Sequence, residues 1–339
     1  MTLVAIDADV LGRQRTGDET YVRNLLVELA ALVAGTDLRI AAITRRPDLV
    51  PPGVEAVELG TRAQEIRMAW TLAQALRRLG ADLCHTQYAL PLRPPCPCVV
   101  TIHDLSFERR PELMGWKDRT VFRRVVPRAA RGAARVLTVS ERTKHDLVEL
   151  YAVPPERVVV TLNGVDPAFS PGRDEARRNY VLAVGAVERR KNQLAALAAA
   201  NEVGLPLVVV GPEKDAALAA ELRRGGARLE GYLEPSRLAD LYRGAACLVQ
   251  TSSFEGFGLP VLEAMASGTP VVAVHEPALE EVAGGAAVLV DDGAIADGIR
   301  TAGAERQRLT AAGLERARAF SWRATAERTL AVYREVLER

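Results

Sequence analysis

Short apolar runs of strand length alternate with longer helical patterns along almost the whole chain. This alternation restricts the fold more than any other feature of the sequence. Near-continuous apolar strands separated by helices are typical of parallel sheets that helices cover on both faces. The pattern occurs in two successive sets, one in each half of the chain. The sequence therefore predicts an α/β protein with two doubly wound, Rossmann-like domains.

The expected elements follow from apolar periodicity and from the turn residues between the runs. Strands are expected at 2–7, 38–44, 54–58, 82–86, 97–103, 134–139, 180–185, 206–211, 246–250, 270–274 and 286–290. Helices are expected at 17–34, 63–79, 117–131, 140–150, 192–203, 214–224, 235–244 and 323–338. A further apolar helix is expected to run through Ala264 to Gly268.

Proline, glycine and charged residues gather at 166–178, and this composition indicates a linker between the two sets. We expect a first domain at 1–170, a second at 171–319 and a final helix at 320–339. Ligands of open parallel sheets bind at the carboxyl ends of the strands. Two such domains facing each other would place the ligand site in the cleft between them.

Composition narrows the function further. The chain of 339 residues has a formal net charge of +1, which does not favour bulk nucleic-acid binding. Its four cysteines do not form a disulfide framework, and no apolar run is long enough to span a membrane. The start of the chain is a strand pattern rather than a signal peptide. A reducing cytosol is the simplest compartment for this chain.

The segment from Glu255 to Glu263 carries the strongest chemical signal, Glu-Gly-Phe-Gly-Leu-Pro-Val-Leu-Glu. Gly256 and Gly258 allow backbone N–H groups to approach a ligand closely, and a helix start suits phosphate. Carboxylates accept hydrogen bonds from hydroxyls. Phosphate at one end and hydroxyls at the other describe a sugar nucleotide. The alternative is that each Glu only caps a helix or interacts with its dipole.

A second segment, Gly185-Ala-Val-Glu-Arg-Arg-Lys-Asn192, follows an expected strand and opens a helix. Arg190 and Lys191 could hold a pyrophosphate, the first by its planar fork and the second as a point charge. The alternative is a solvated charge cluster. Cations are poorly placed at a helix N-terminus for stability alone, which favours the binding role.

In the first domain, His103 and Asp104 end a buried strand at its carboxyl end, where parallel sheets place function. Gly17 lies between the first strand and the first helix, where a glycine can approach a ligand. Asp7-Ala-Asp9 is an Asp-x-Asp string, but it lies at the first strand and is weak support for a metal site. We predict no catalytic metal and no other cofactor.

The Glu255–Glu263 string and the following Glu-Ala-Met-Ala-Ser-Gly-Thr-Pro-Val-Val closely resemble the signature of retaining GT-B glycosyltransferases of family 4, the group 1 glycosyltransferases. The Arg-Lys-Asn and His-Asp strings resemble the same family, and the likeness covers about residues 1–335. It implies two Rossmann-like domains facing across a cleft, with the final helix crossing back to the first domain.

The resemblance also implies roles for individual residues. Arg190 and Lys191 match the phosphate-binding pair, and Glu263 matches the residue that holds the ribose hydroxyls. Glu255 and the 256–259 backbone, including Phe257 and Leu259, match the family residues that bind the sugar hydroxyls. His103 would face the transferred sugar. The remaining matches are Gly17 and Gly185 in the ligand loops, and Tyr232 and Leu233 beside the nucleobase.

Two positions depart from the family pattern. Ala186 stands where many relatives have Arg, which leaves open which arginine contacts phosphate. The first loop has Gly17-Asp18-Glu19 in place of a second glycine, which leaves the contacts of Asp18 open. A non-catalytic nucleotide-sugar-binding module therefore stays an alternative. A sugar-nucleotide epimerase of the same architecture is a weaker one, because those enzymes lack the string that joins Glu255 to Glu263.

The resemblance implies a metal-independent hexosyl transfer from a nucleoside-diphosphate sugar with retained anomeric configuration. Many mannosyltransferases share these strings, so GDP-mannose is the first expected donor, followed by UDP-glucose or UDP-N-acetylglucosamine. A glycan, a lipid-linked glycan or a small molecule could be the acceptor. The sequence does not specify an oligomeric state.

Region 109–135 carries nine Arg or Lys residues against two acidic residues, interleaved with apolar side chains. Such a basic amphipathic surface could contact anionic lipid or a lipid-linked acceptor at the inner membrane face. A solvated helical face, or a surface for a charged soluble acceptor, is the alternative.

Overall fold

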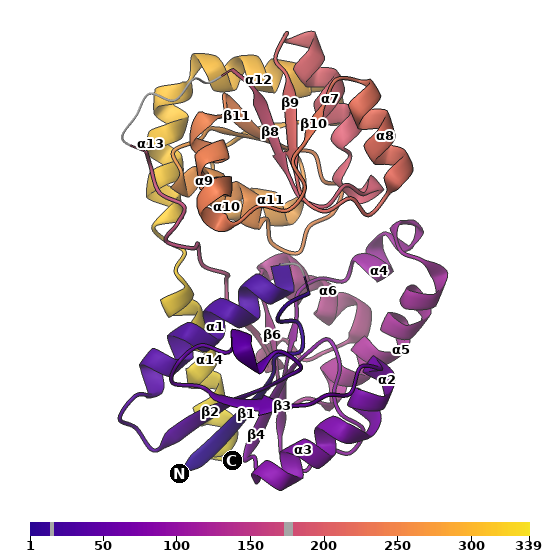
Figure 1. Ribbon diagram of the computed structural model, residues 1–339, viewed down its shortest axis with the longest axis vertical. Coiled ribbons are helices and arrows are strands. Elements are labelled where there is room, and N and C mark those ends of the chain that lie inside the picture. The colour runs from indigo at the N-terminus through magenta and orange to yellow at the C-terminus, as the bar shows by residue number, and fades with distance from the viewer. Residues whose placement is uncertain (14–16, 173–178) are drawn as a thin grey trace. The chain divides into compact units, whose positions relative to one another are not determined.

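The computed structural model describes residues 1–13, 17–172 and 179–339 and contains two compact units. The N-terminal unit consists of residues 1–164 together with 322–339, and the C-terminal unit consists of residues 165–321. Each unit has one parallel sheet with helices around it (Figure 1). Residues 173–178 of the expected linker lie outside the described residues.

The N-terminal unit has a seven-stranded sheet in the order β3-β2-β1-β4-β5-β6-β7, and every neighbouring pair is parallel. Strand order reverses between β1 and β4, which is where open α/β sheets place ligands. The strands are β1 Thr2–Asp7, β2 Leu38–Thr44, β3 Glu55–Glu58, β4 Leu83–Gln87, β5 Cys98–Ile102, β6 Arg135–Thr138 and β7 Val158–Val160.

Six α-helices of this unit are α1 Gly17–Val33, α2 Gln64–Ile66, α3 Leu72–Leu79, α4 Ser106–Arg109, α5 Trp116–Gly132 and α6 Glu141–Tyr151. A π-helical turn, Arg67–Thr71, joins α2 to α3. The last helix of the chain, α14 Trp322–Leu337, belongs to this unit and lies beside α1 (Figure 1). In the part of the chain that the structure describes, no helix has the length and apolar character needed to cross a membrane.

The C-terminal unit has a six-stranded parallel sheet in the order β10-β9-β8-β11-β12-β13. Its strands are β8 Val181–Val184, β9 Leu207–Val210, β10 Arg228–Leu229, β11 Cys247–Gln250, β12 Val271–Val274 and β13 Val288–Val290. Its α-helices are α7 Gln193–Glu202, α8 Ala216–Arg224, α9 Pro235–Gly244, α10 Leu259–Ala266, α11 Pro277–Ala283, α12 Ile295–Ala304 and α13 Arg306–Ala317. The strand order reverses between β8 and β11, so their carboxyl-end loops are the expected ligand position.

The apolar pattern predicted eleven of these strands close to their observed bounds, and it missed the short β7 and β10. It also missed α4, α11, α12 and α13. Helix α12 contains two interior glycines, which lower helix propensity. It forms because tertiary packing overrides propensity: a Cβ at Gly298 would lie 2.6 Å from Val272, so only glycine allows this approach to β12.

A buried polar contact joins the last helix to the N-terminal sheet. His85 in β4 is fully buried, with Nδ1 2.5 Å from the Tyr333 hydroxyl of α14 and Nε2 2.7 Å from the Thr101 hydroxyl of β5. Burial, with a smaller contribution from His103, lowers the pKa of His85 to about 3. The imidazole is therefore neutral in the folded chain, and its role is structural.

This burial makes stability depend on pH. Because the folded pKa lies below the unfolded value near 6.5, the unfolded chain binds the extra proton as the pH falls through 6.5. The free energy of unfolding should then drop by about 2 kcal/mol between pH 7 and pH 5 through His85 alone. Chemical denaturation of the native chain and of His85→Gln at both pH values measures this term as their difference. An equal pH dependence in the two chains would contradict it.

Candidate functional site

The loop from β8 to α7 brings two cations to the carboxyl end of the C-terminal sheet. After Gly185 the chain forms a 3₁₀ turn, Arg189–Lys191, and then Asn192 with a φ of 48° precedes α7. The predicted helix start is therefore a separate tight turn, which presents Arg190 and Lys191 before the helix begins. The Gln193 side chain closes the loop by donating to the Ala186 carbonyl at 2.8 Å.

Gly211 permits the close approach of this loop to the end of β9. Its φ is +148°, and a Cβ built there would lie 2.1 Å from the Gly185 carbonyl oxygen. Gly211→Ala should therefore displace the cation loop, with a stability loss of about 1–3 kcal/mol and a slower reaction. Gly293→Ala, an exposed glycine with open space around it, is the matched control. Thermal unfolding and activity measure both effects, and two indistinguishable variants would contradict the role of Gly211.

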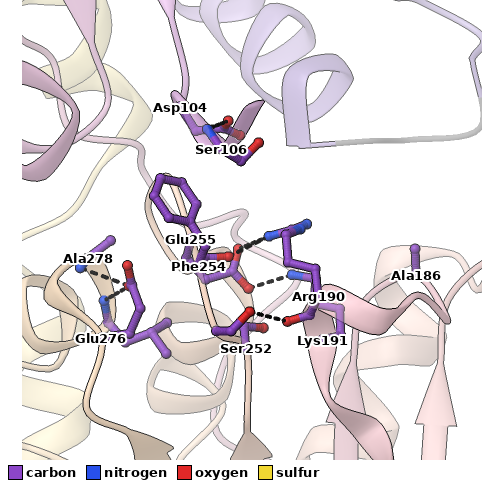
Figure 2. A network of polar contacts seen from close by, with 12 residues as sticks. Asp104, Ser106, Ala186, Arg190, Lys191, Ser252, Phe254, Glu255, Glu276 and Ala278 are labelled. Carbon is purple, nitrogen blue, oxygen red and sulfur yellow. Dashed lines mark hydrogen bonds and ion pairs between the residues drawn. The ribbon is translucent and has the colours of Figure 1, made fainter. Parts of the chain in front are cut away.

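Both cations point to the carboxylate of Glu255, which lies in the loop between β11 and α10 (Figure 2). Lys191 Nζ is 2.5 Å from Oε1 and Arg190 Nη1 is 3.1 Å from Oε2. Arg190 also donates to the Phe254 carbonyl at 2.6 Å and to Glu188 at 2.9 Å. Arg190 therefore holds the loop in place, while Lys191 Nζ has one acceptor among the described residues and keeps N–H groups for a ligand.

The electrostatics of this cluster favour the charged pair. Burial alone would raise the pKa of Glu255, but Lys191, Arg190 and hydrogen bonds lower it to about 2. Burial lowers the pKa of the Lys191 ammonium, and Glu255 opposes that shift. The carboxylate stays ionised at every physiological pH. The cluster is therefore a fixed arrangement of charges in a largely buried setting, where an anion interacts more strongly than in water.

Residues at the end of β11 support the cluster and were not predicted. Gln250 Nε2 donates to Glu255 Oε1 at 2.8 Å and to the Ser252 hydroxyl at 2.9 Å. The Thr251 hydroxyl donates to the backbone carbonyl of Lys191 at 2.7 Å. The sequence signal that could have indicated them is the polar run Gln-Thr-Ser-Ser directly after a buried strand, at the carboxyl edge of a parallel sheet.

The glycine segment after Glu255 ends at the start of α10. Gly258 has a φ of +112° and precedes Leu259, the first helical residue. Pro260 has no N–H and Val261 N–H donates to the Gly258 carbonyl at 3.0 Å, so the N–H of Leu259 is the first-turn donor that a ligand at this edge could use. Phe257 is buried and packs edge-on against Phe320, with ring centroids 5.9 Å apart. The predicted contacts of Gly256 to Leu259 with a ligand would thus be made through the backbone, while the Phe257 ring anchors the loop.

Glu263 lies one turn into α10 rather than before the helix, and it has a different environment from Glu255. Its Oε2 accepts a hydrogen bond from the Tyr242 hydroxyl at 2.8 Å. Burial raises the pKa of Glu263 to about 7, although the Tyr242 hydrogen bond opposes the shift. Tyr242 was not predicted as a partner. The two carboxyl groups of one string are therefore in opposite electrostatic states, one always charged and one close to its midpoint at neutral pH.

Tyr232 and Leu233 lie between β10 and α9, directly after Gly231, whose φ is +66°. The Tyr232 side chain is 40% exposed and Leu233 is half-buried. An exposed aromatic side chain at the carboxyl edge of the sheet agrees with a surface on which a flat ring could pack. Its role as a nucleobase contact stays a prediction.

The predicted residues of the N-terminal unit lie at the carboxyl edge of its own sheet. His103 follows β5 and is 7% exposed. Its Nε2 atom lies 2.8 Å from the amide oxygen of Gln87 and 3.9 Å from Asp18 Oδ1. Gly17 is the first residue of α1. Gln87 was not predicted, although its position at the end of β4 is the same kind of signal as that of His103.

Asp7 and Asp9 are both paired with arginines. Arg67 of the π-helical turn binds Asp7 in a bidentate manner, with distances of 2.5 and 2.7 Å. Arg45 binds Asp9 in the same way, at 2.7 and 3.1 Å. Among residues 1–13, 17–172 and 179–339, no group of three or more His, Cys, Asp or Glu side chains could hold a metal ion. The Asp-x-Asp string thus organises the first loop through ion pairs.

Comparison with known families covers both units. Residues 15–169 match the family model for glycosyltransferase family 4, and residues 168–316 match that for glycosyl transferases group 1. An O-antigen chain mannosyltransferase B from Escherichia coli is 30% identical over 327 residues, which cover 87% of this chain and 83% of that protein. A D-inositol 3-phosphate glycosyltransferase from Acidothermus cellulolyticus is 30% identical over 406 residues, covering 99% and 90%.

The fold has solved counterparts. The sucrose-phosphate synthase of Thermosynechococcus elongatus superimposes with a TM-score of 0.81 at 22% identity, and the match covers 100% of both chains. It confirms the GT-B architecture, which consists of two parallel-sheet α/β units. Both halves of the sequence, its curated relatives and its fold agree: this chain belongs to the group 1 glycosyltransferases of family 4 and is a glycosyltransferase that uses a nucleotide-sugar donor.

Proposed function

We propose that this enzyme transfers a hexose from a nucleoside-diphosphate sugar to an acceptor hydroxyl, retains the anomeric configuration and needs no metal. The observation that carries the proposal is the largely buried cluster of Lys191, Arg190 and Glu255 beside the Gly185 loop. It provides cations for a diphosphate without a metal ion. A carboxylate on the same cluster can accept hydrogen bonds from sugar hydroxyls.

The reaction breaks the bond between the anomeric carbon and the phosphate oxygen. Negative charge develops on the leaving diphosphate, and Lys191 and the first turn of α10 stabilise it. The acceptor oxygen forms its bond to the anomeric carbon on the face that the phosphate leaves, and its proton passes to the departing phosphate oxygen. Glu255 orients the sugar hydroxyls, Glu263 holds the ribose hydroxyls and His103 contacts the transferred sugar.

GDP-mannose is the first donor to test, because three of the relatives are named as mannosyltransferases. UDP-glucose and UDP-N-acetylglucosamine follow. The acceptor class stays broad: a glycan, a lipid-linked glycan or a small molecule such as the inositol phosphate in the name of one relative. Glycan, polysaccharide or glycolipid synthesis is the corresponding biological process.

The experiment uses a panel of GDP-, UDP-, ADP- and dTDP-sugars with a chelator and measures release of nucleoside diphosphate, with and without candidate acceptors. Release from one or two donors names the substrate and supports metal independence. Proton NMR of the first product then shows its anomeric configuration, and an inverted anomer would overturn the retaining mechanism. Tight donor binding without any release would favour the non-catalytic module, and conversion of the donor sugar itself would favour an epimerase.

We also propose that helix α5 contacts anionic membrane lipid. Its exposed face carries Lys117, Val121, Arg124, Arg128 and Arg131 at helical spacing, and the exposed Trp116 lies at its start. A stripe of cations flanked by an aromatic side chain suits the headgroup region of a bilayer. The opposite face of the helix, which includes Val126, Ala129 and Ala130, is buried in the unit.

Vesicle co-sedimentation tests this surface. The chain should bind vesicles that contain phosphatidylglycerol and release them at high salt, while vesicles of phosphatidylcholine bind weakly. Arg124→Glu with Arg128→Glu should reduce binding by about tenfold or more, since each cation contributes about 1 kcal/mol. The matched control, Arg224→Glu with Arg228→Glu, changes two arginines of the C-terminal unit. Equal vesicle binding by the two double variants would exclude α5 as the membrane-binding surface.

A further inference from the structure

Gln87 and His103 lie side by side at the carboxyl edge of the N-terminal sheet, at the ends of the neighbouring strands β4 and β5. Gln87 is the last residue of β4 and pairs in register with Thr101 of β5, and His103 follows the end of β5. The amide oxygen of Gln87 lies 2.8 Å from His103 Nε2. Sheet register therefore fixes the two side chains as neighbours at the carboxyl edge, where parallel sheets place function.

The partners of this imidazole determine which nitrogen carries its proton. An amide oxygen only accepts hydrogen bonds, so Nε2 must donate to Gln87. Asp18 Oδ1, 3.9 Å from the same Nε2, also favours a proton there. Among the described residues no hydrogen bond reaches Nδ1, so in the neutral ring this atom keeps a lone pair for an O–H donor.

Packing contacts fix the plane of the His103 ring, but they do not determine which ring nitrogen carries the proton. Tyr21 contacts the imidazole edge-on, with ring centroids 4.9 Å apart, and Tyr88 lies at 5.6 Å. Tyr88 has a φ of 58°, a left-handed conformation that costs energy in a side chain of this size and is concentrated at functional sites. The Thr143 hydroxyl donates to the His103 carbonyl at 3.1 Å. These contacts orient the ring, and none of them selects a tautomer.

We propose that Gln87 is a positioning residue, which holds His103 as the neutral Nε2–H tautomer so that Nδ1 accepts a hydrogen bond from a sugar hydroxyl. The identity of the hydroxyl-bearing ligand rests on the proposed function. The tautomer itself does not, because it is a property of the chain without substrate. The amide nitrogen of Gln87 is buried and has no hydrogen-bond partner among the described residues.

The direct test is ¹⁵N NMR of the imidazole rings in chain labelled at histidine, at pH 8, with His103→Gln to assign the signal. His103 should show a protonated Nε2 and an unprotonated Nδ1. In Gln87→Met this preference should weaken to a mixture of tautomers. In Gln87→Glu the protonated nitrogen should stay the same, because a carboxylate oxygen also only accepts hydrogen bonds. An Nδ1–H tautomer in the native chain, or an unchanged tautomer in Gln87→Met, would overturn the proposal.

Activity gives a second readout with its own control. Gln87→Met should lower kcat about tenfold or more, while thermal stability and the donor KM stay near native values. Gln87→Glu keeps an acceptor for the Nε2 proton, so at high pH its kcat should lie much closer to the native value than that of Gln87→Met. Gln74→Met, at an exposed glutamine of the same unit, should behave as the native chain. If the native chain transfers no sugar, the proposed function fails while the NMR result still decides the role of Gln87. Native activity in Gln87→Met would exclude a positioning role in catalysis.

Discussion

Replacing Lys191 with methionine is expected to slow glycosyl transfer by about 10²- to 10³-fold, the usual loss when one preorganised group that stabilises developing negative charge is removed. Lys191 Nζ lies in a largely buried cluster and has a single acceptor among the described residues, Glu255 at 2.5 Å. Its remaining N–H groups can bind the leaving diphosphate. Steady-state kinetics with the best donor measure the effect, which should fall mainly on kcat.

The same substitution also weakens the fold, and a second variant separates the two effects. Without Lys191 the buried Glu255 loses its ammonium partner and keeps Arg190, Gln250 and Ser252 nearby, so the chain should lose about 1–3 kcal/mol of stability. Lys191→Met combined with Glu255→Gln removes the buried charge and should recover stability without recovering activity. Lys214→Met, at an exposed lysine of the same unit, is the control and should stay within about twofold of native. Recovery of activity in the double variant would mean that Lys191 only neutralises Glu255.

Donor affinity is expected to rise with pH until about pH 7, because burial raises the pKa of Glu263 to about 7. In the proposed donor site the ionised carboxylate would accept hydrogen bonds from the ribose hydroxyls, whereas the protonated group offers fewer acceptor sites. Between pH 7.5 and pH 5.5 the Kd for the donor should increase roughly 20-fold if only the carboxylate form binds. Titration with an intact nucleoside-diphosphate sugar measures this, since its esterified phosphates lack the second phosphate pKa near 6.

Two variants identify the group that titrates. Glu263→Gln should bind more weakly at pH 7.5 and lose the pH dependence. Tyr242→Phe removes a hydrogen bond that lowers the pKa of Glu263, so the midpoint should move to higher pH. An affinity that does not depend on pH in the native chain, or that keeps its pH dependence in Glu263→Gln, would exclude Glu263 as the ribose contact.

The free energy of unfolding should depend on pH in the opposite direction: ionisation of Glu263 strengthens donor binding but destabilises the fold. Because the folded pKa of Glu263 lies above its unfolded value near 4.5, the carboxyl group contributes stability at acid pH that is lost as the pH rises through 7. At pH 8 the buried charge therefore costs about 3 kcal/mol. Glu263→Gln should unfold at a higher temperature than the native chain at pH 8 while it binds donor more weakly. Such a trade of stability for binding is common at functional sites.

The sequence was sufficient for the sheet architecture, while the binding roles of the side chains that it singled out stay predictions. Apolar runs located most strands, and the string from Glu255 to Glu263 indicated the position where Lys191 and Arg190 converge in the structure. This position could be predicted because the carboxyl ends of parallel strands lie along one edge of the sheet, and ligands bind at that edge.

The supporting residues could not be predicted in the same way. Tyr242 and Gln87 act through contacts with residues that follow or belong to other elements, and Gln250 acts through a contact with the loop after its own strand. Local periodicity contains no information on such side-chain pairing. Their residue types are also common in ordinary turns and cores. The opposite pKa shifts of Glu255 and Glu263 depend on burial and on these partners, so the sequence showed two similar carboxylates where the structure has two different ones.

The most direct test of the central claim is a crystal structure of the chain with the nucleoside diphosphate of its best donor. The diphosphate should lie within hydrogen-bonding distance of Lys191 Nζ and of the backbone N–H of Leu259, which begins α10, and the ribose hydroxyls should reach Glu263. A diphosphate bound away from Lys191, with the Glu255 cluster unchanged and unoccupied, would contradict the assignment of the donor site.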